Sequence, residues 1–366
     1  MIEQRFGESE PFSVGVEEEL MILDATTLAL TPAVSTLLAG AAGRDLPGTL
    51  KTELHASVVE LTTGVCGSPH QALAELRALR VAAIEIAGER GLEVAAGGSH
   101  PFSPPEQQEI AAEERYADFV AYAGVTARRQ GVSGLHVHVG MPGSEECLHA
   151  LEGVLPWLPV LLALSANSPY LEGAETGHLS IRAEILGLLP RRGAPPAFAS
   201  FGAWERFVSL FQRVGLIAEY TQLWWDVRPH PRFGTLEIRA TDQPTSLDLS
   251  GAFVALLQAL CVTALGRPRR PPDPAGRGVY DQNRWAALHR GPRAELIHPD
   301  RDSLVPVPEL AAELLEQVAP AAAELGTSEL LARLDPASCE GDRQLEIGRE
   351  RGLEAVCSDL VARSVP

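Results

Sequence analysis

Residues 235–242 read Thr-Leu-Glu-Ile-Arg-Ala-Thr-Asp, and polar and apolar side chains alternate along them. Successive side chains of a β-strand point to opposite faces, so this alternation predicts a strand with one polar and one buried face. The polar face would carry Thr235, Glu237, Arg239 and Thr241. A sheet of such strands buries one side in a core and presents ionisable groups on the other.

Two earlier stretches show the same pattern. Val-Gly-Val-Glu-Glu-Glu-Leu presents Glu17 and Glu19 on one face of a strand, and His-Val-His-Val presents His136 and His138. The valines that follow each histidine would face a core. Several strands of the chain therefore carry paired ionisable residues.

A fourth stretch contains Glu53 and Glu60, which are seven residues apart. This odd spacing would place them on opposite faces of one unbroken strand. Because the β-branched Val58 and Val59 follow a polar segment, we expect a turn after Glu53 and a strand over 58–62 that carries Glu60.

The composition excludes several classes of partner. The formal net charge of −18 argues against a protein that binds nucleic acid or anionic membranes non-specifically, because both need a surplus of Lys and Arg. Lys51 is the only lysine, which excludes a Gly-Lys-Ser/Thr phosphate loop and leaves arginine to contact phosphate. The five cysteines lack Cys-x-x-Cys spacing and indicate reduced thiols.

The first residues contain no apolar segment typical of a secretion signal, so we expect a cytoplasmic protein. The longest apolar run, 154–166, is too short to span a bilayer and predicts a buried helix. We expect small-molecule substrates, with no nucleic acid and no membrane as partners. A homodimer is the general expectation for such an enzyme.

The order of the predicted elements indicates the fold class. Helices are expected near 69–91, 106–130, 145–166, 203–220 and 246–265. Segments 224–227 and 235–240 should form a late hairpin. Since strands and helices do not alternate in a βαβ rhythm, and the chain from about 242 reads as mainly helical, we expect one catalytic domain, 1–366. Its class would be α+β, with a largely antiparallel sheet.

Carboxylates with a neutral imidazole and no thiolate suit hard divalent ions such as Mg²⁺ or Mn²⁺. The number of ligands exceeds the needs of one ion, so two or three ions that bridge a nucleotide fit better. Taken alone, Glu17 and Glu19 also fit a solvated strand face, and His136 and His138 fit hydrogen-bonded residues at a strand edge. Their joint occurrence favours the metal site.

Three arginines lie in or beside the late hairpin. Arg228, Arg232 and Arg239 carry fork-shaped guanidinium groups that can hold the phosphates of a nucleotide and neutralise a transition state. Arg228 and Arg232 also fit ordinary surface charges of a hairpin.

Residues 177–182, Gly-His-Leu-Ser-Ile-Arg, can supply a carboxylate clamp for an amino-acid substrate, or form an ordinary loop and strand start. We therefore name His178 and Arg182, with His138, as candidate substrate-binding residues.

In their order and spacing, six segments resemble the type 2 glutamate–cysteine ligases, which are carboxylate–amine ligases of the glutamine synthetase-like superfamily. The segments are Val-Gly-Val-Glu-Glu-Glu-Leu (14–20), Glu-Leu-His-Ala-Ser-Val-Val-Glu-Leu-Thr-Thr-Gly (53–64), Gly-Ser-His-Pro-Phe (98–102), Gly-Leu-His-Val-His-Val-Gly (134–140), Leu-Leu-Ala-Leu-Ser-Ala-Asn-Ser-Pro (161–169) and Trp-Trp-Asp-Val-Arg-Pro-His-Pro-Arg-Phe-Gly-Thr-Leu-Glu-Ile-Arg (224–239). The resemblance covers most of the chain. It implies a glutamine synthetase-like fold, in which a curved, largely antiparallel sheet carries the active site on one face and packs against helices on the other.

The resemblance also implies two Mg²⁺ sites that touch the phosphates of ATP. The ligand sets would be Glu17, His136 and Glu237 for one ion, and Glu19, Glu53 and Glu60 for the other. Arg239 would contact the transferring γ-phosphoryl group, and we name Arg239, Glu60 and Glu237 as the catalytic residues.

The implied reaction phosphorylates a substrate carboxylate and lets an amine displace the phosphate. Glutamate, activated at its γ-carboxylate, and the amine of cysteine are the usual pair in the family. Three alternatives remain open: a ligase of the same mechanism with another acid or amine, a metal-dependent amidohydrolase that uses His136 and His138, and a non-catalytic sensor of nucleotides or amino acids.

Overall fold

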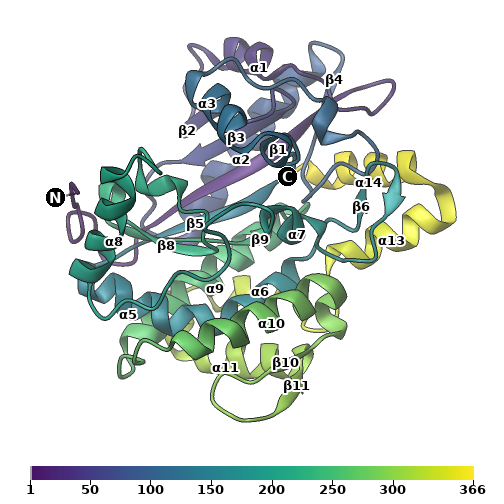
Figure 1. The fold of residues 1–366 in the computed structure, drawn as a ribbon. Helices are drawn as coiled ribbons and strands as arrows, with labels where there is room; N and C mark the ends of the chain where they lie inside the picture. Colours follow the sequence, from purple (N-terminus) through teal and green to yellow (C-terminus); the bar gives the residue numbers. More distant parts are fainter. Residues whose placement is uncertain (1) are drawn as a thin grey trace.

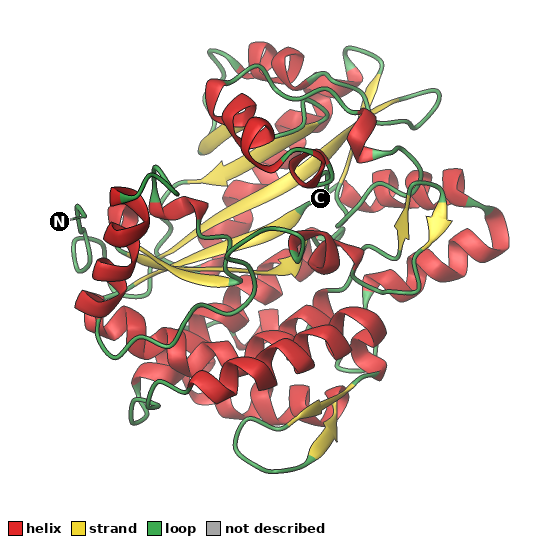
Figure 2. Ribbon diagram, in the orientation of Figure 1, coloured by secondary structure: helices red, strands yellow, loops and turns green. Residues whose placement is uncertain are grey.

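The computed structural model describes residues 2–366 and is built around one seven-stranded sheet (Figure 1 and Figure 2). The strands follow the order β2-β3-β1-β5-β9-β8, β4 pairs with β1, and all pairings are antiparallel. Their bounds are β1 Val14–Asp24, β2 Gly48–Thr52, β3 Val58–Thr63, β4 Leu92–Ala95, β5 Gly134–Gly140, β8 Val227–His230 and β9 Thr235–Asp242.

Helices cover the face of the sheet that carries the apolar side chains. Val137, Val139, Leu236 and Ile238 are fully buried in one core cluster with side chains of several helices. They include α5 Ser144–Val154, α6 Leu158–Ser165, α9 Leu247–Leu265 and α11 Val307–Glu324. In Figure 1 they gather on one side of the molecule, below β5, β8 and β9.

Two of these helical segments, Ser144–Ser165 and Leu247–Leu265, are long and apolar enough to cross a membrane by length and composition. Most of each segment is buried inside the protein, as in the core helices of soluble folds. The apolar run at 154–166 thus lies in the core, where we predicted a buried helix.

The other helices lie around this core. They are α1 Val34–Ala41, α2 Pro69–Gly88, α3 Glu114–Ala123, α4 Val125–Arg128, α7 Ile181–Leu186, α8 Phe201–Arg213, α10 Pro274–Arg290, α12 Ser328–Leu331, α13 Glu340–Arg351 and α14 Leu353–Ser364. Two small hairpins lie outside the main sheet: β6 Tyr170–Leu171 with β7 Ala174–Glu175, and β10 Glu295–Ile297 with β11 Leu304–Pro306. Neither hairpin was predicted.

The predicted α+β class with an antiparallel sheet is confirmed. The late hairpin also forms, but its first strand begins at Val227, later than the predicted start at Trp224. Pro229 lies in this strand and is tolerated because β8 is at the edge of the sheet, where a missing backbone N–H costs no pairing.

A β-bulge interrupts the pairing of β5 with β9. Leu135 pairs with Thr241 but Val137 pairs with Ile238, so β9 has one extra residue opposite His136. Partners in an antiparallel pair lie on the same face of a sheet, so Thr241 shares the buried face of Leu135. Our prediction that Thr241 lies on the polar face was wrong, because strict alternation assumes an unbroken strand.

Candidate active site

Cross-strand pairing gathers ionisable residues on one face of the sheet. Glu17 of β1 pairs with His136 of β5. His138 of β5 pairs with Glu237 of β9, which pairs in turn with Arg228 of β8. Directly opposed residues place their Cβ atoms about 4.5–5.5 Å apart, so these side chains form one continuous charged surface.

The same surface continues across the other half of the sheet. Glu19 pairs with Glu60 of β3, and Glu60 pairs with Lys51 of β2. Glu53 lies in the turn between β2 and β3, outside either strand. The predicted turn after Glu53 and strand that bears Glu60 are therefore confirmed.

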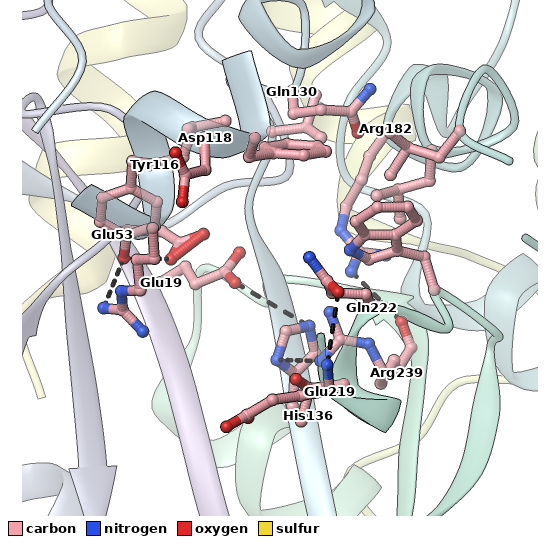
Figure 3. Close-up of a pocket in the computed structure, with 18 of the residues that line it drawn as sticks. Glu19, Glu53, Tyr116, Asp118, Gln130, His136, Arg182, Glu219, Gln222 and Arg239 are labelled. Carbon is pink, nitrogen blue, oxygen red and sulfur yellow. Dashed lines mark hydrogen bonds and ion pairs between the residues drawn. The ribbon is translucent and has the colours of Figure 1, made fainter. Parts of the chain in front are cut away.

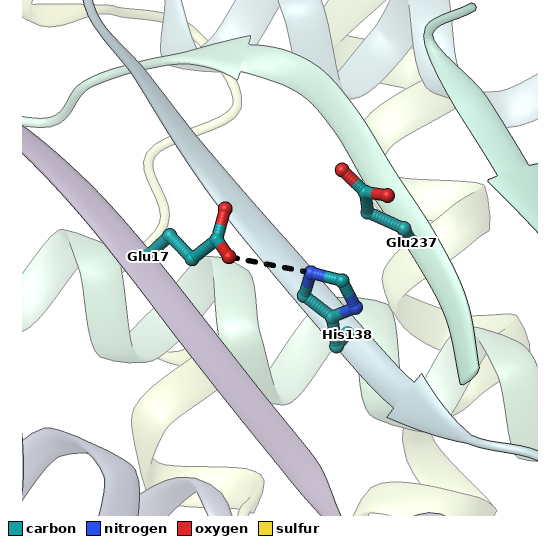
Figure 4. A group of neighbouring side chains, drawn as sticks. All are labelled: Glu17, His138 and Glu237. Atoms are coloured by element: carbon teal, nitrogen blue, oxygen red, sulfur yellow. Dashed lines mark ion pairs between the residues drawn. The ribbon is translucent and has the colours of Figure 1, made fainter. Parts of the chain in front are cut away.

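Glu17, His138 and Glu237 form the closest group of potential metal ligands in the described part of the chain (Figure 4). One ligand atom from each residue lies within 4.8 Å of the others. The resemblance had implied His136 in this set. The structure brings His138 there instead, because His138 is the cross-strand partner of Glu237 and the bulge falls opposite His136.

His138 presents a nitrogen that lacks a partner to this group. Its Nδ1 lies 2.9 Å from Oγ1 of Thr235. Its Nε2 is buried, has no hydrogen-bond partner among residues 2–366 and lies 3.7 Å from Oε1 of Glu17. A buried polar atom without a hydrogen-bond partner lowers the stability of the fold, so a ligand bound to Nε2 would remove this cost. In the neutral ring with Nδ1–H donating to Thr235, Nε2 carries a lone pair, and with two carboxylates it fits Mg²⁺ or Mn²⁺.

Two arginines hold Glu237. Arg228 forms a bidentate pair with it, at 2.7 Å from Nε to Oε2 and 2.9 Å from Nη2 to Oε1, and Arg239 places Nη1 2.6 Å from Oε1. Burial would raise the pKa of Glu237, but Arg228, Arg239 and His138 lower it well below its usual value. Nη1 of Arg228 donates to two backbone carbonyls. Arg228 thus positions Glu237, and its contact with a phosphate stays a prediction.

His136 lies between the two halves of the site. Its Nδ1 is 3.2 Å from Oε2 of Glu17 and 3.4 Å from Nη1 of Arg239, and its Nε2 is 3.9 Å from Oε1 of Glu19. Burial and the charge of Arg239 lower the pKa of His136 to about 4. The ring is therefore neutral near pH 7.

The carboxylates beside β1 repel one another. Burial and the charge of Glu53 raise the pKa of Glu19 to about 8. Burial and the charges of Glu17 and Glu53 raise the pKa of Glu60 to about 7. Crowded carboxylates of this kind are stabilised in their ionised form by a bound cation.

Lys51 supplies one positive charge beside these carboxylates. Its Nζ lies 3.3 Å from Oε1 of Glu60, which also accepts a hydrogen bond of 2.9 Å from Oγ1 of Thr62. Glu53 accepts a hydrogen bond of 3.3 Å from the hydroxyl of Tyr116. Glu60 and Glu53 therefore each have a local partner in this structure.

A cavity of about 520 Å³ opens beside these carboxylates (Figure 3). We call it the Arg182 cavity. Its inner wall contains Glu19, Glu53, His136, Arg182 and Arg239. Its outer wall is formed by α3 and the segment 218–224, with Arg115, Tyr116, Asp118, Phe119, Glu219, Gln222 and Trp224.

Arg182 has side-chain N–H groups in this cavity that lack a partner in the described part of the chain. It is buried, and its Nε and Nη1 have no hydrogen-bond partner within 2–366. Nη2 donates to the carbonyl oxygen of Arg239 at 3.2 Å, and Nη1 is 3.9 Å from Oδ1 of Asp242. A buried guanidinium with N–H groups left over is suited to an anionic ligand, and a carboxylate matches its fork.

A second cavity of about 440 Å³ is lined by Glu17 and His138. We call it the Phe233 cavity. Phe233 and Val65 expose large apolar surfaces there, and Arg5 and Arg232 line the same space. The Phe233 ring contacts His138 edge-on and stacks on His230, with centroids 5.6 Å and 4.1 Å apart.

One predicted site residue lies elsewhere. His178 is in the loop before α7 and contacts His289 of α10, with Nδ1 atoms 3.4 Å apart, and it lines neither cavity. Arg232 does line the Phe233 cavity, but its exposed guanidinium is 3.4 Å from Glu219. Arg182, from the same predicted clamp as His178, is the member that reaches the site.

The structure adds residues that we did not predict. Thr235 orients His138, Tyr116 contacts Glu53, and Phe233 forms the apolar wall of the second cavity. The alternation in β9 already placed Thr235 on the face of Glu237 and was the available signal for it. No pattern in the sequence pointed to Tyr116, because α3 contacts the site only in the folded chain.

The model of the family described as glutamate–cysteine ligase family 2 matches residues 13–356. A Rubrobacter xylanophilus protein provisionally named glutamate–cysteine ligase 2-3 is 39% identical over 98% of this chain and 99% of its own length. A Sorangium cellulosum protein, provisionally named glutamate–cysteine ligase 2, is 39% identical over 96% of each chain.

Among solved structures, a Francisella tularensis glutamate–cysteine ligase in complex with AMP has a TM-score of 0.70 at 14% identity, covering 98% of this chain and 89% of its own. A bifunctional glutathione synthetase from Pasteurella multocida has a TM-score of 0.66 at 17% identity, covering 96% of this chain and 52% of its own. These two structures share the fold. Together with the family match and its relatives, they support a ligase of the glutamate–cysteine ligase type, and the chain belongs to glutamate–cysteine ligase family 2.

Proposed function

We propose that the protein is an ATP-dependent ligase that joins the γ-carboxylate of L-glutamate to the amine of L-cysteine. The products would be γ-glutamylcysteine, ADP and phosphate. The observation that carries the proposal is the group of Glu17, His138 and Glu237. Glu17 and His138 line the Phe233 cavity, and His136 and Arg239, which contact Glu17 and Glu237, line the Arg182 cavity. This arrangement suits a reaction in which a phosphoryl group passes from a ligand in one cavity to a ligand in the other.

The Phe233 cavity suits the nucleotide. Its exposed Phe233 and Val65 offer apolar surface to a purine ring, and Arg5 and Arg232 offer positive charge. Glu17 and His138 line its inner end, so a triphosphate there would point toward the carboxylates of the sheet. The adenine would stack against Phe233 in this arrangement.

The residues that would hold one Mg²⁺ or Mn²⁺ are Glu17, His138 and Glu237, and Glu19, Glu53 and Glu60 would hold a second. When bound, such ions neutralise phosphate charge and polarise the phosphoryl group. The protein supplies fixed carboxylates for this purpose. Arg228 keeps Glu237 ionised and in place.

The Arg182 cavity suits the acid and the amine. Arg182 would bind the α-carboxylate of glutamate through its available N–H groups, and Arg239 would contact the transferring γ-phosphoryl group. The γ-carboxylate oxygen attacks phosphorus and ADP leaves, which gives an acyl phosphate. The deprotonated amine then attacks the acyl carbon, and the C–O bond to phosphate breaks.

The outer wall of the Arg182 cavity can exclude water during this second step. Phe119 and Trp224 contact each other there, with ring centroids 5.2 Å apart. Water excluded from the acyl phosphate cannot hydrolyse it before the amine reacts. Asp118 and Glu219 at the same wall carry charge that attracts an ammonium group.

The test is an ATP-consumption assay across a panel of acids and amines with Mg²⁺ or Mn²⁺, followed by mass spectrometry of the product. We expect phosphate release that requires both glutamate and cysteine, and a product of the mass of γ-glutamylcysteine. Turnover with another pair of acid and amine would support a ligase but contradict the proposed substrates. ATP binding without turnover for every pair would indicate a sensor, and amide cleavage without nucleotide a hydrolase.

A further inference from the structure

Gly134 is the first residue of β5 and shares the polar face with His136 and His138, because these positions are two residues apart along one strand. It is the position on this face of β5 that lies next to Arg182. Where the other two positions carry imidazole rings, Gly134 carries no side chain. The guanidinium group of Arg182 occupies the space.

The fit between Gly134 and Arg182 is close. A methyl group added at the Cα atom of Gly134 would lie 2.0 Å from Nη2, 2.5 Å from Cζ and 2.8 Å from Nε of Arg182. Contacts this short do not occur, so any side chain at 134 would displace the guanidinium group. The neighbouring backbone of β5 would not have to move, because the atoms met belong to the end of a flexible side chain.

The opposite wall of this slot is Asp242, the cross-strand partner of Gly134. Its carboxylate accepts hydrogen bonds from the backbone N–H of Asn167 at 2.9 Å and from the hydroxyls of Ser168 at 2.6 Å and Ser180 at 2.7 Å. Asp242 is therefore fixed, and its charge faces Arg182 at 3.9 Å.

Gly134 also touches the metal-binding half of the site. Its backbone N–H donates to Oε2 of Glu19 at 2.7 Å. Gly134 thus contacts two groups of the site. The absence of a side chain leaves room for Arg182, and the backbone N–H fixes the carboxylate of Glu19.

We propose that Gly134 enables binding of the acid substrate, by forming with Asp242 the slot that aims the Arg182 guanidinium at a carboxylate. The inference rests on the proposed function, in which Arg182 binds the α-carboxylate of the acid. Gly134 acts as a positioning residue through Arg182. Asp242 positions the same group from the other side.

The test compares Gly134→Ala with the wild-type protein in two measurements, the KM for each substrate and the Kd for glutamate without turnover. We expect the KM and Kd for the acid to rise about 10- to 100-fold, as for a lost charge-assisted contact, and the KM for ATP to stay within about 2-fold. Gly88→Ala is the matched control, since a methyl group at Gly88 meets no atom within 4 Å.

The double variant Gly134→Ala, Arg182→Met decides whether Gly134 acts through Arg182. We expect it to bind the acid no more weakly than Arg182→Met alone. The inference would be overturned if the increases in the Kd for the acid caused by Gly134→Ala and by Arg182→Met multiplied in the double variant. An equal rise in the KM for ATP and for the acid in Gly134→Ala would also overturn it. Asp242→Asn provides a second route to the slot if Gly134→Ala does not fold, and it should weaken acid binding and spare ATP.

Failure of the inference and failure of the proposed function give different results. If the wild-type protein turns over glutamate but Gly134→Ala binds it normally, the slot has no role and only the inference fails. If the wild-type protein neither binds glutamate nor consumes ATP with any acid, the proposed function fails and takes the inference with it.

Discussion

Consecutive residues of β1 show two opposite uses of a buried carboxylate. Glu18, on the helix-covered face, has both oxygens occupied: Arg80 lies 2.6 Å and 2.7 Å away, and Ser250 and Gln243 donate to the same carboxylate. On the other face, Glu17 lies beside the Nε2 atom of His138, which lacks a partner. The two faces are built from the same residue types.

The two faces of the sheet have different roles, one structural and one functional. On the Glu18 face every strong donor and acceptor of the pair is matched within the protein, so the pair holds the fold together. On the Glu17 face the matching is incomplete at His138 and Arg182, and ligands must complete it.

The largest effect is expected on the polar face. Glu237→Gln should lower turnover by at least about 10³-fold, because it removes a charge shared by Arg228, Arg239 and the proposed metal ion. The measurement is product formation at saturating ATP. Glu175→Gln, which breaks an exposed pair with Arg349, is the control and should keep full activity. A Glu237→Gln variant with normal turnover would refute the site.

On the other face, Arg80→Met should lower the free energy of unfolding by about 3–5 kcal/mol, since it leaves the Glu18 carboxylate buried without its partner. Urea unfolding measures the change. The folded variant should bind Mn²⁺ as tightly as the wild-type protein does. A loss of Mn²⁺ affinity in the folded state would show that the two faces are not independent.

Thr235→Val tests the orientation of the His138 ring. The valine keeps the shape but cannot accept a hydrogen bond from Nδ1–H, so the Mn²⁺ affinity should fall about 10- to 100-fold. Electron paramagnetic resonance of Mn²⁺ reports this without turnover. Thr235→Ser keeps the hydroxyl and should retain most of the affinity. Equal affinities for the valine and serine variants would contradict this role of Thr235.

The smallest effect concerns pH. Burial raises the pKa of Glu19 to about 8 and that of Glu60 to about 7, against about 4.3 in an unfolded chain. Between pH 5 and 8 the folded metal-free protein therefore holds protons that the unfolded chain has released, and its stability falls as the pH rises. A bound divalent ion needs ionised carboxylates.

The Tm difference between Mn²⁺-loaded and metal-free protein should therefore widen from pH 6 to 8, by roughly 2–4 °C. Differential scanning calorimetry at several pH values measures it. In the Glu19→Gln variant, this increase in the Tm difference between pH 6 and 8 should be smaller. A gap that is constant or narrows with pH would show that these carboxylates do not hold the ion.

Much of the site could be predicted from the sequence because strand alternation is a local rule. It grouped Glu17 with Glu19 and His136 with His138, and the odd spacing of Glu53 and Glu60 predicted the turn between them. In the structure, Glu17 and Glu19 lie in one strand and His136 and His138 in another, as predicted. The turn after Glu53 is also found.

The rest depended on contacts between distant segments. Nothing local revealed the bulge in β9, so Thr241 was assigned to the wrong face. The resemblance implied His136 as a metal ligand with Glu17 and Glu237, and the structure groups His138 with these two carboxylates. His178 and Arg182 are close in sequence, but a short helix follows His178 and carries only Arg182 to the site. The sequence indicated either a surface charge or a phosphate ligand for Arg228. Its ion pair with Glu237 depends on the pairing of β8 with β9, which only the fold establishes.

The single lysine of the chain has a practical consequence. Lys51 lies beside Glu60 with about half of its side chain exposed, so the folded protein offers one ε-amine at the edge of the carboxylate row. An amine-reactive fluorophore would attach there and at the N-terminus only. The chain thus contains its own attachment point for a reporter, next to the place where ions and phosphates are expected to bind, without the introduction of a cysteine.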